Sequence, residues 1–389
     1  MTRLFSAEER QAIRSEFPHL QGRAYLNYAS VGPLPLRARL RIDEINDVFQ
    51  RLDRNFDPET DEAVARARTA CAALIGGDVT GLGLFPNTSY GLNWALGFLR
   101  PRSGEAVLIC DQEFPALRYA TWHLRHFGVA TVTVAVPPYG GLTPEDLDRH
   151  LTRHPEVKVV ATSWVSFRSG YRCDLAGLAE VAHRHGAHLL VDGIQGIGTR
   201  PLEAEASGVD VVCAAVHKWL CCPVGMGFAW CRRELLEQHI SPWGGWMSVD
   251  WHAQYGQLLG EIRDMNRGPR TAETGTVNFQ GVRAMAETTA WIAELGVDRI
   301  ACHTDELLDL VYGSLDRERY VWLSDREEGA RSSIVCIRPQ NGDAEALRRF
   351  LSARGLVTGV REGALRISPH FPTLRSEVEQ LVHSLHEFE

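Results

Sequence analysis

The sequence predicts an α/β fold built on a mainly parallel β-sheet that is covered by helices. Residues 189–191 form a short apolar run, and residues 209–216 form a second one that only Asp210 interrupts, which is typical of strands buried on both faces of such a sheet. The first run ends at Asp192, and His217 and Lys218 follow the second. Because open α/β sheets bind ligands at the carboxyl ends of their strands, we expect these polar residues to face one pocket.

Other helices and strands alternate along the chain, as an α/β sheet requires. The first predicted helix covers residues 6–17, with Ser6 as its N-cap and Glu8 and Glu9 in its first turn. Helical periodicity also covers residues 36–52, 60–75 and 175–185, and apolar runs predict strands at residues 82–85, 106–110, 129–136 and 157–161.

Composition and charge exclude several classes of protein. With 389 residues, 44% of them hydrophobic, the chain is long enough for two domains with sizeable cores. A net charge of −8 gives no support to nucleic acid or an anionic membrane as a partner. No apolar run reaches the length of a membrane span, and the N-terminal residues lack a signal-peptide core. The nine cysteines have no paired C-x-x-C spacing and predict reduced thiols. We therefore expect a cytoplasmic protein without a metal site.

Lys218 and Asp192 are informative as a pair. Taken alone, a lysine after a strand is usually solvated, and an aspartate there is usually a turn or helix-cap residue. Together they are what pyridoxal phosphate needs, namely an amine that forms a Schiff base and a carboxylate that keeps the pyridine nitrogen protonated. A non-catalytic binding protein that retains such a fold is the alternative of another class, but it would normally have lost one of the two residues.

The segment Asp192-Gly193-Ile194-Gln195, followed by His217-Lys218, resembles the class V aminotransferase family of fold-type I pyridoxal phosphate enzymes. That group includes cysteine desulfurases, selenocysteine lyase, kynureninase, isopenicillin N epimerase-like proteins and C–S lyases. The resemblance extends from about Tyr25 to the C-terminus. It implies a seven-stranded type of sheet sandwiched by helices, a smaller α+β C-terminal domain and pyridoxal 5'-phosphate as the cofactor.

The pattern beyond residue 278 supports this domain organisation. A long helix over residues 279–295 is the expected bridge into the second domain, where strands at residues 333–337 and 356–360 flank a helix at 343–354 and a last helix covers 376–388. We expect three parts: residues 1–35, an N-terminal segment packing on the active site; residues 36–280, the large cofactor-binding domain; and residues 281–389, the small domain.

The resemblance also assigns residues to the cofactor. Thr88 and Ser89 open a helix whose free amides suit an anion, and the family places the cofactor phosphate there, although a capped helix explains the same residues. Phe114 matches the ring that stacks on the pyridine, with a core phenylalanine as the alternative reading. Ala215 stands where many relatives have a serine that binds the phosphate.

Four further cofactor residues follow from the same resemblance. Ser166 is expected near the phenolic oxygen of the cofactor, and Gln195 is expected to donate a hydrogen bond to that oxygen. His217 is expected to position the cofactor. Thr276 matches a threonine that reaches the phosphate of the partner subunit, which implies a homodimer with shared active sites.

The substrate is expected to be an amino acid. Arg366, in Leu365-Arg366-Ile367-Ser368, matches the arginine that grips the α-carboxylate of the substrate. Asn27, Tyr28 and Ser30 lie at the expected mouth of the site. Trp243 begins a Gly- and Trp-rich loop, residues 243–251, that we interpret as a pocket wall, with a hydrophobic plug as the alternative.

The reaction is less constrained than the cofactor. The resemblance implies that Lys218 removes the Cα proton. Desulfurases carry a mobile cysteine before the C-terminal arginine strand, but residues 357–366 contain none, and Cys336 fits an apolar strand pattern. We therefore expect a β-eliminating C–S lyase acting on a cysteine conjugate, in specialised metabolite biosynthesis. An aminotransferase, an epimerase and a decarboxylating oxidative deaminase are the alternatives.

Overall fold

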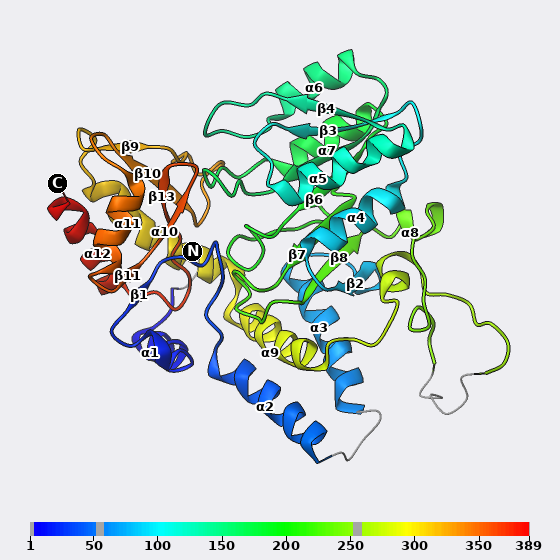
Figure 1. Cartoon of the computed structure of the whole chain (residues 1–389), viewed down its shortest axis with the longest axis horizontal. Helices are drawn as coiled ribbons and strands as arrows, with labels where there is room; N and C mark the ends of the chain where they lie inside the picture. The colour runs from blue at the N-terminus through cyan, green and yellow to red at the C-terminus, as the bar shows by residue number, and fades with distance from the viewer. Residues whose placement is uncertain (1–3, 52–57, 252–258, 389) are drawn as a thin grey trace.

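A computed structural model of the chain describes residues 4–51, 58–251 and 259–388, and its centre is a seven-stranded sheet. From edge to edge the strands are β2 (Leu82–Phe85), β8 (Gly227–Cys231), β7 (Val211–Ala215), β6 (His188–Asp192), β5 (Val157–Ser163), β3 (Ala106–Cys110) and β4 (Ala130–Val134). Strand β8 runs antiparallel to both of its neighbours, and the other pairs are parallel. The predicted α/β class is thus confirmed (Figure 1).

Helices cover both faces of this sheet because successive strand residues point to opposite sides. In β3, Val107 and Ile109 pack with α4 (Thr88–Leu99), α5 (Pro115–His123) and α8 (Leu235–Gln238). The alternate residues Ala106 and Leu108 belong to the other layer. That layer contains α3 (Pro58–Leu74), α6 (Pro144–Arg153), α7 (Leu175–Arg184) and α9 (Phe279–Leu295). Burial on both faces explains why the strands appear in the sequence as continuous apolar runs.

A second, smaller unit lies at one end of the molecule (Figure 1). Its antiparallel sheet has the order β12 (Gly359–Arg361), β13 (Ala364–Ile367), β10 (Val335–Pro339), β9 (Tyr320–Trp322). Helices α10 (Val297–Ser314), α11 (Ala344–Ser352) and α12 (Arg375–Glu387) pack with this sheet. The N-terminal part begins with α1 (Ala7–Ser15) and then joins this unit, since β1 (Ala24–Tyr25) pairs in parallel with β11 (Leu356–Val357).

The structure differs from the predicted elements at a few places. One strand was expected over residues 356–360, but β11 and β12 are separate because they pair with different partners, β1 and β13. Strands β8 and β9 and helices α5, α8 and α10 were not predicted. The helix expected over residues 36–52 is α2 (Leu36–Gln50), and Leu52 lies outside the described residues.

The packing of α9 bears on the domain boundary. This helix packs against α2 and α3 of the large unit, and Val282 and Ile292 are buried in the large core. The small unit has a core of its own, to which α10 contributes Leu307 and Leu308. We therefore propose that the large unit continues to Gly296, between α9 and α10, rather than to residue 280.

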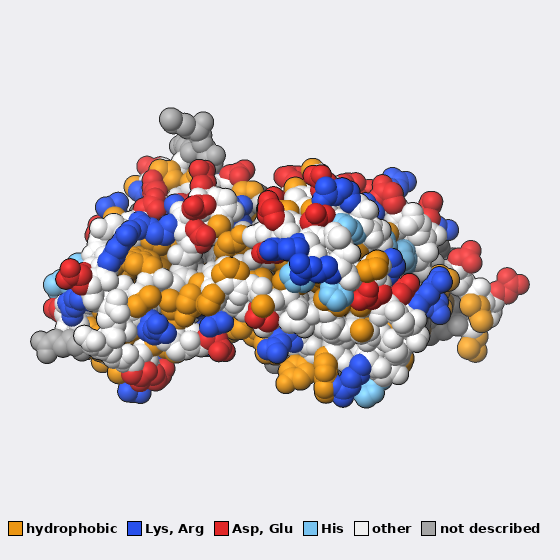
Figure 2. Space-filling model, turned by 90° about the horizontal axis from the view of Figure 1, so that it is seen from above, with side chains coloured by type: hydrophobic (Ala, Val, Ile, Leu, Met, Phe, Trp, Pro, Cys, Tyr) orange, Lys and Arg blue, Asp and Glu red, His pale blue; other side chains and the backbone are white. Residues whose placement is uncertain are grey.

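The surface carries charges of both signs. Figure 2 shows acidic and basic side chains interspersed over one face of the molecule, with hydrophobic side chains between them. In the three stretches of chain that the structure describes, no helix combines the length and the apolarity needed to cross a membrane.

The amino-terminal edge of the sheet is held by the buried carboxylate of Asp210, just before β7. It accepts hydrogen bonds from the Leu189 amide at 2.7 Å and from His183 Nε2 at 2.8 Å, and Arg232 Nε lies 2.8 Å away. Burial acts to raise the pKa of Asp210, but the nearby His188 ring, with Nδ1 3.4 Å from Oδ1, and the hydrogen bonds from Leu189 and His183 outweigh it and hold that pKa below its usual value.

Replacing this carboxylate should destabilise the fold. We expect Asp210→Asn to lower the free energy of unfolding by on the order of 2 kcal/mol at neutral pH, because cationic partners lose a buried acceptor. Since the folded-state pKa is depressed, the stabilisation is present above pH 3.8 and is lost as the pH falls through the folded pKa. Denaturant unfolding at several pH values measures this. Glu379→Gln, at the exposed pair Arg375–Glu379, is the control, and equal stability of the two variants would contradict the assignment.

Candidate active site

Lys218 and Asp192 meet at the carboxyl edge of the large sheet. Asp192 is the last residue of β6, and Lys218 follows the neighbouring parallel strand β7 by three residues. The Asp192 carboxylate is buried, and its Oδ1 accepts a hydrogen bond from the Ile194 amide at 3.0 Å. Each of the two side chains shifts the pKa of the other, which places the amine and the acid in one electrostatic environment.

Burial dominates the ionisation of both groups. It lowers the pKa of Lys218 and raises the pKa of Asp192, and the attraction between the two charges opposes both shifts. The positive charges of Arg366 and Arg361 lower the pKa of Lys218 further, and the Glu113 carboxylate raises that of Asp192. The amine is therefore neutral at a lower pH than an ordinary lysine, which suits a nucleophile and a base.

Phe114 faces this pair. The centroid of its ring lies 5.8 Å from Lys218 Nζ, and the ring of Phe167 packs edge-on against it at 5.1 Å. The preceding residue, Glu113, is buried and accepts hydrogen bonds from the Ser163 amide at 2.9 Å and from Thr162 Oγ1 at 3.0 Å. Glu113 thus fixes the end of β3 to the end of β5 and sets the position of Phe114. Glu113 is a residue of the site that the sequence alone did not indicate.

The start of α4 lies beside the end of β7. Asn87 caps the helix by accepting from the Tyr90 amide at 3.1 Å, and Thr88 Oγ1 accepts from the Ala215 amide at 2.8 Å. The first amides of a helix have no intrahelical acceptor, so those of Thr88 and Ser89 remain available to an anion. Ala215, at the position where relatives often have serine, therefore contributes through its backbone.

Gln195 and Ser166 already make hydrogen bonds within the protein. Gln195 is buried, donates to the Ala29 carbonyl at 3.1 Å and accepts from Trp219 Nε1 at 3.1 Å. One amide hydrogen of Gln195 remains for a ligand. Ser166 Oγ accepts from the amides of Arg168 and Ser169, both at 3.3 Å, so its oxygen caps a turn and only its proton is free.

His217 is held by the N-terminal segment. Its carbonyl accepts a hydrogen bond from the Gly32 amide at 2.8 Å. A Cβ at Gly32 would lie 2.1 Å from the Lys218 carbonyl oxygen, so only glycine permits this approach. Burial, aided by the charge of Lys218, lowers the pKa of His217. A neutral imidazole suits the predicted positioning role better than proton donation.

Arg366 lies on the other side of the site, in β13. Its side chain is 1% exposed, with Nη1 donating to the Phe167 carbonyl at 3.1 Å and Nη2 to Ser30 Oγ at 2.7 Å. Ser30 in turn donates to Asn27 Oδ1 at 2.9 Å. The structure thus brings together three residues that the sequence analysis assigned to the substrate. It adds Arg361, whose Nη2 donates to the same Ser30 oxygen at 3.2 Å.

Two residues predicted to touch substrate lie elsewhere. Tyr28 is fully buried, stacked on Trp219 with ring centroids 6.5 Å apart and edge-on to His370, so the structure assigns it to the core. Trp243 packs edge-on against Tyr90 with centroids 6.2 Å apart. Within one protomer this packing favours the hydrophobic plug over the pocket wall for the ring of Trp243, because the ring contacts another aromatic side chain.

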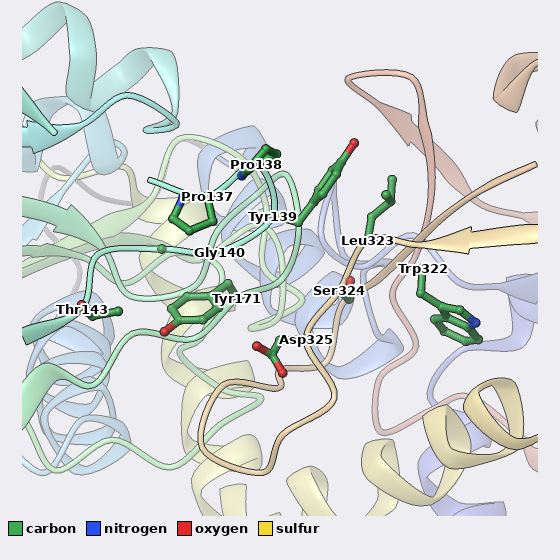
Figure 3. A pocket seen from close by; sticks show the side chains of 11 residues that line it. Pro137, Pro138, Tyr139, Gly140, Thr143, Tyr171, Trp322, Leu323, Ser324 and Asp325 are labelled. Atoms are coloured by element: carbon green, nitrogen blue, oxygen red, sulfur yellow. The ribbon is translucent and has the colours of Figure 1, made fainter. Parts of the chain in front are cut away.

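Two cavities lie near these elements. One, of about 630 Å³, is lined by Thr276, Trp246, Trp251 and Met226, so part of the predicted wall loop does line a cavity. The other, of about 500 Å³, lies between the large and small units. Figure 3 shows Pro137, Tyr139 and Tyr171 on one side of it and Leu323, Ser324 and Asp325 on the other. Neither Lys218 nor Asp192 lines this second cavity, which is therefore separate from the site.

The residues present fit pyridoxal phosphate. One oxygen of Asp192 accepts no hydrogen bond from the described residues and suits the N–H of a protonated pyridine. Lys218 would hold the aldehyde carbon, and the α4 amides would hold the phosphate. When bound, the cofactor supplies a ring that accepts the electrons released at Cα of an amino acid. The fold and these residues define a pyridoxal phosphate-dependent enzyme.

Comparison with known proteins identifies the family. A profile described as Aminotransferase class-V matches residues 44–374, and the chain belongs to that family. The uncharacterized aminotransferase YcbU of Bacillus subtilis is 26% identical over 96% of this chain and 97% of its own length. Isopenicillin N epimerase of Streptomyces clavuligerus is 27% identical over 92% and 93%. A cysteine desulfurase of Klebsiella pneumoniae is 26% identical over 78% and 76%.

Solved structures support the same fold. The cystine C–S lyase C-DES, in complex with its reaction product cysteine persulfide, matches with a TM-score of 0.86 and 21% sequence identity. The match covers 96% of this chain and 99% of that chain. At this identity the likeness shows the fold.

Removing the amine should release the covalent link to the cofactor. Lys158 and Lys218 are the lysines of this chain, and all other basic residues among the 41 are arginines. We expect Lys218→Ala to lose the violet absorption band of lysine-linked pyridoxal phosphate, and Lys158→Ala to keep it. Absorption spectra of the purified proteins measure this. A violet band in Lys218→Ala would show that the cofactor is attached elsewhere.

Asp192→Asn tests the ring-nitrogen contact. A neutral amide cannot hold the pyridine nitrogen in its protonated state, so we expect Cα proton removal to slow by at least about 100-fold while the violet band persists. Exchange of the Cα hydrogen of an amino acid for deuterium, followed by NMR, reports this step whatever the later reaction. Asp148→Asn, at a surface carboxylate paired with His185, is the control. Unchanged exchange in Asp192→Asn would contradict the assignment.

Proposed function

We propose that this enzyme is a β-eliminating C–S lyase that acts on a cysteine conjugate. The observation that carries this proposal is the lack of a usable thiol. All nine cysteines are free, and all except Cys302 are buried. Cys336, in β10, is fully buried and burial raises the pKa of its thiol to about 12. A desulfurase needs a thiol that takes up sulfur, whereas an elimination needs none.

The protein residues perform the elimination in a defined order. Arg366 holds the α-carboxylate through paired N–H donors. The Lys218 amine then takes the Cα proton. Its lowered pKa favours this step, because a neutral amine can accept a proton. The Cβ–S bond breaks, and its electron pair leaves with sulfur as a thiolate, which gains a proton. Hydrolysis of the three-carbon fragment with one water gives pyruvate and ammonia, so the balance is one thiol, one pyruvate and one ammonia per substrate.

The remaining predicted residues complete the proposal. Phe114 stacks on the pyridine, Gln195 and Ser166 donate to its phenolic oxygen, and His217 positions it. Thr88 and Ser89 bind the phosphate together with Thr276 of a second copy. Support for that second copy comes from Thr276, which lines the cavity of about 630 Å³, a cavity that Lys218 does not line. Nine free cysteines support a reducing compartment, the cytoplasm. A role in specialised metabolite biosynthesis remains part of the proposal.

Transamination or epimerisation is the second candidate. The relatives named as an aminotransferase and as isopenicillin N epimerase match over nearly the whole chain, 96% and 92%. Both reactions begin with the same proton removal at Cα as the elimination, but neither releases a thiol. The product therefore separates them.

A panel of S-substituted cysteines tests the proposal. We expect equal amounts of pyruvate, thiol and ammonia, no carbon dioxide and no requirement for a keto acid, because elimination regenerates the cofactor without a second substrate. Assays of all four products with wild-type and Lys218→Ala enzyme measure this. Keto-acid-dependent turnover without thiol release would replace the lyase with a transaminase, and carbon dioxide release would replace it with a decarboxylating deaminase.

A further inference from the structure

Two arginines project from the same face of one hairpin beside the candidate active site. Strands β12 and β13 are joined by Glu362 and Gly363, both with positive φ, as a two-residue hairpin turn requires. Gly359 lies opposite Arg366, and Arg361 lies opposite Ala364. Because residues directly opposite share a face, and residues two apart along a strand do as well, Arg361 and Arg366 point to the same side.

One hydroxyl oxygen holds both guanidinium groups. Ser30 Oγ accepts from Arg366 Nη2 at 2.7 Å and from Arg361 Nη2 at 3.2 Å. Its own proton goes to Asn27 Oδ1, so the hydroxyl is fully used. Gly359 leaves room for that asparagine, since a Cβ there would lie 2.8 Å from Asn27 Oδ1. The hairpin and the N-terminal segment therefore fix two like charges close together.

No protein carboxylate compensates these charges. Within residues 4–51, 58–251 and 259–388, neither Arg361 nor Arg366 forms an ion pair, and Arg366 Nε is buried without a hydrogen-bond partner. The charge of Arg361 acts on Arg366 and on Lys218, and it lowers the pKa of both beyond the effect of burial. Such repulsion is relieved when anions bind.

A substrate with one carboxylate leaves one of these cations uncompensated. Arg366 is 1% exposed and takes the α-carboxylate in the proposed function, whereas Arg361 is exposed at the rim. The two guanidinium groups thus lie at different depths, with Arg366 inside the protein and Arg361 at its surface. The charge at this rim fits an anionic end group on that substituent.

We propose that Arg361 binds a second anionic group of the substrate, so that the enzyme prefers S-substituted cysteines whose sulfur substituent ends in a carboxylate or a sulfonate. This inference rests on the proposed C–S lyase function, because it assigns the end of the leaving thiol. Ser30 is a positioning residue in this proposal, because its hydroxyl oxygen holds the Arg361 side chain beside Arg366.

A matched pair of substrates tests the inference. S-Carboxymethylcysteine and S-ethylcysteine have similar substituents that differ in charge. We expect the ratio of their kcat/KM values to favour the acidic one and to fall about 10- to 100-fold in Arg361→Gln, because a charge-assisted contact is lost. Arg361→Lys should retain most of the ratio. Arg375→Gln, an exposed arginine on α12, should leave it at the wild-type value. An unchanged ratio in Arg361→Gln would overturn the inference.

A binding measurement separates this inference from the proposed function. 2-Aminoadipate and norleucine match S-carboxymethylcysteine and S-ethylcysteine in length but carry no sulfur, and their binding shifts the absorption band of the holoenzyme without elimination. We expect Arg361→Gln to weaken binding of 2-aminoadipate about 10-fold more than binding of norleucine. If no thiol forms from any S-substituted cysteine but this difference persists, the lyase proposal fails and the role of Arg361 stands. Thiol release without any charge preference in either assay would overturn the role of Arg361 alone.

Discussion

The pairing of half-buried Lys218 with buried Asp192 is the constraint on which the rest of the site depends. Moving an amine and a carboxylate out of water is unfavourable, and their mutual attraction offsets only part of that cost. The shifts of both pKa values away from their usual ranges reflect this imbalance. A rigid parallel sheet can hold the two groups at the ends of adjacent strands. A charged ligand that binds there offsets the rest of the desolvation cost.

The two edges of the sheet have different roles. At the amino-terminal edge, Asp210 is surrounded by cationic and amide donors and stabilises the fold. At the carboxyl edge, Asp192 accepts from one donor among the described residues, the Ile194 amide, and the first amides of α4 have no acceptor within the helix. Donors and acceptors that are satisfied within the protein hold the scaffold, and those left open are the ones that can bind cofactor and substrate.

The N-terminal segment connects the two units of the molecule across the site. It pairs with β11 of the small unit at Tyr25, and the Gly32 amide bonds to the carbonyl of His217 in the large unit. Between these points, Ser30 holds the guanidinium groups of the β12–β13 hairpin. A few residues far from Lys218 in the chain thus set the distance between Lys218 and Arg366.

The sequence by itself determined most strands, most helices and the placement of Asp192 and Lys218 after two successive strands, because periodicity, capping and strand ends are local properties of the chain. It did not show that Tyr28 is buried under Trp219, that Trp243 packs on Tyr90, or that α9 belongs to the large core. It also missed Arg361, which meets Ser30 across 331 positions of sequence. Only tertiary packing decided these contacts, since which face of an aromatic ring or guanidinium remains open depends on neighbours that are distant in the chain.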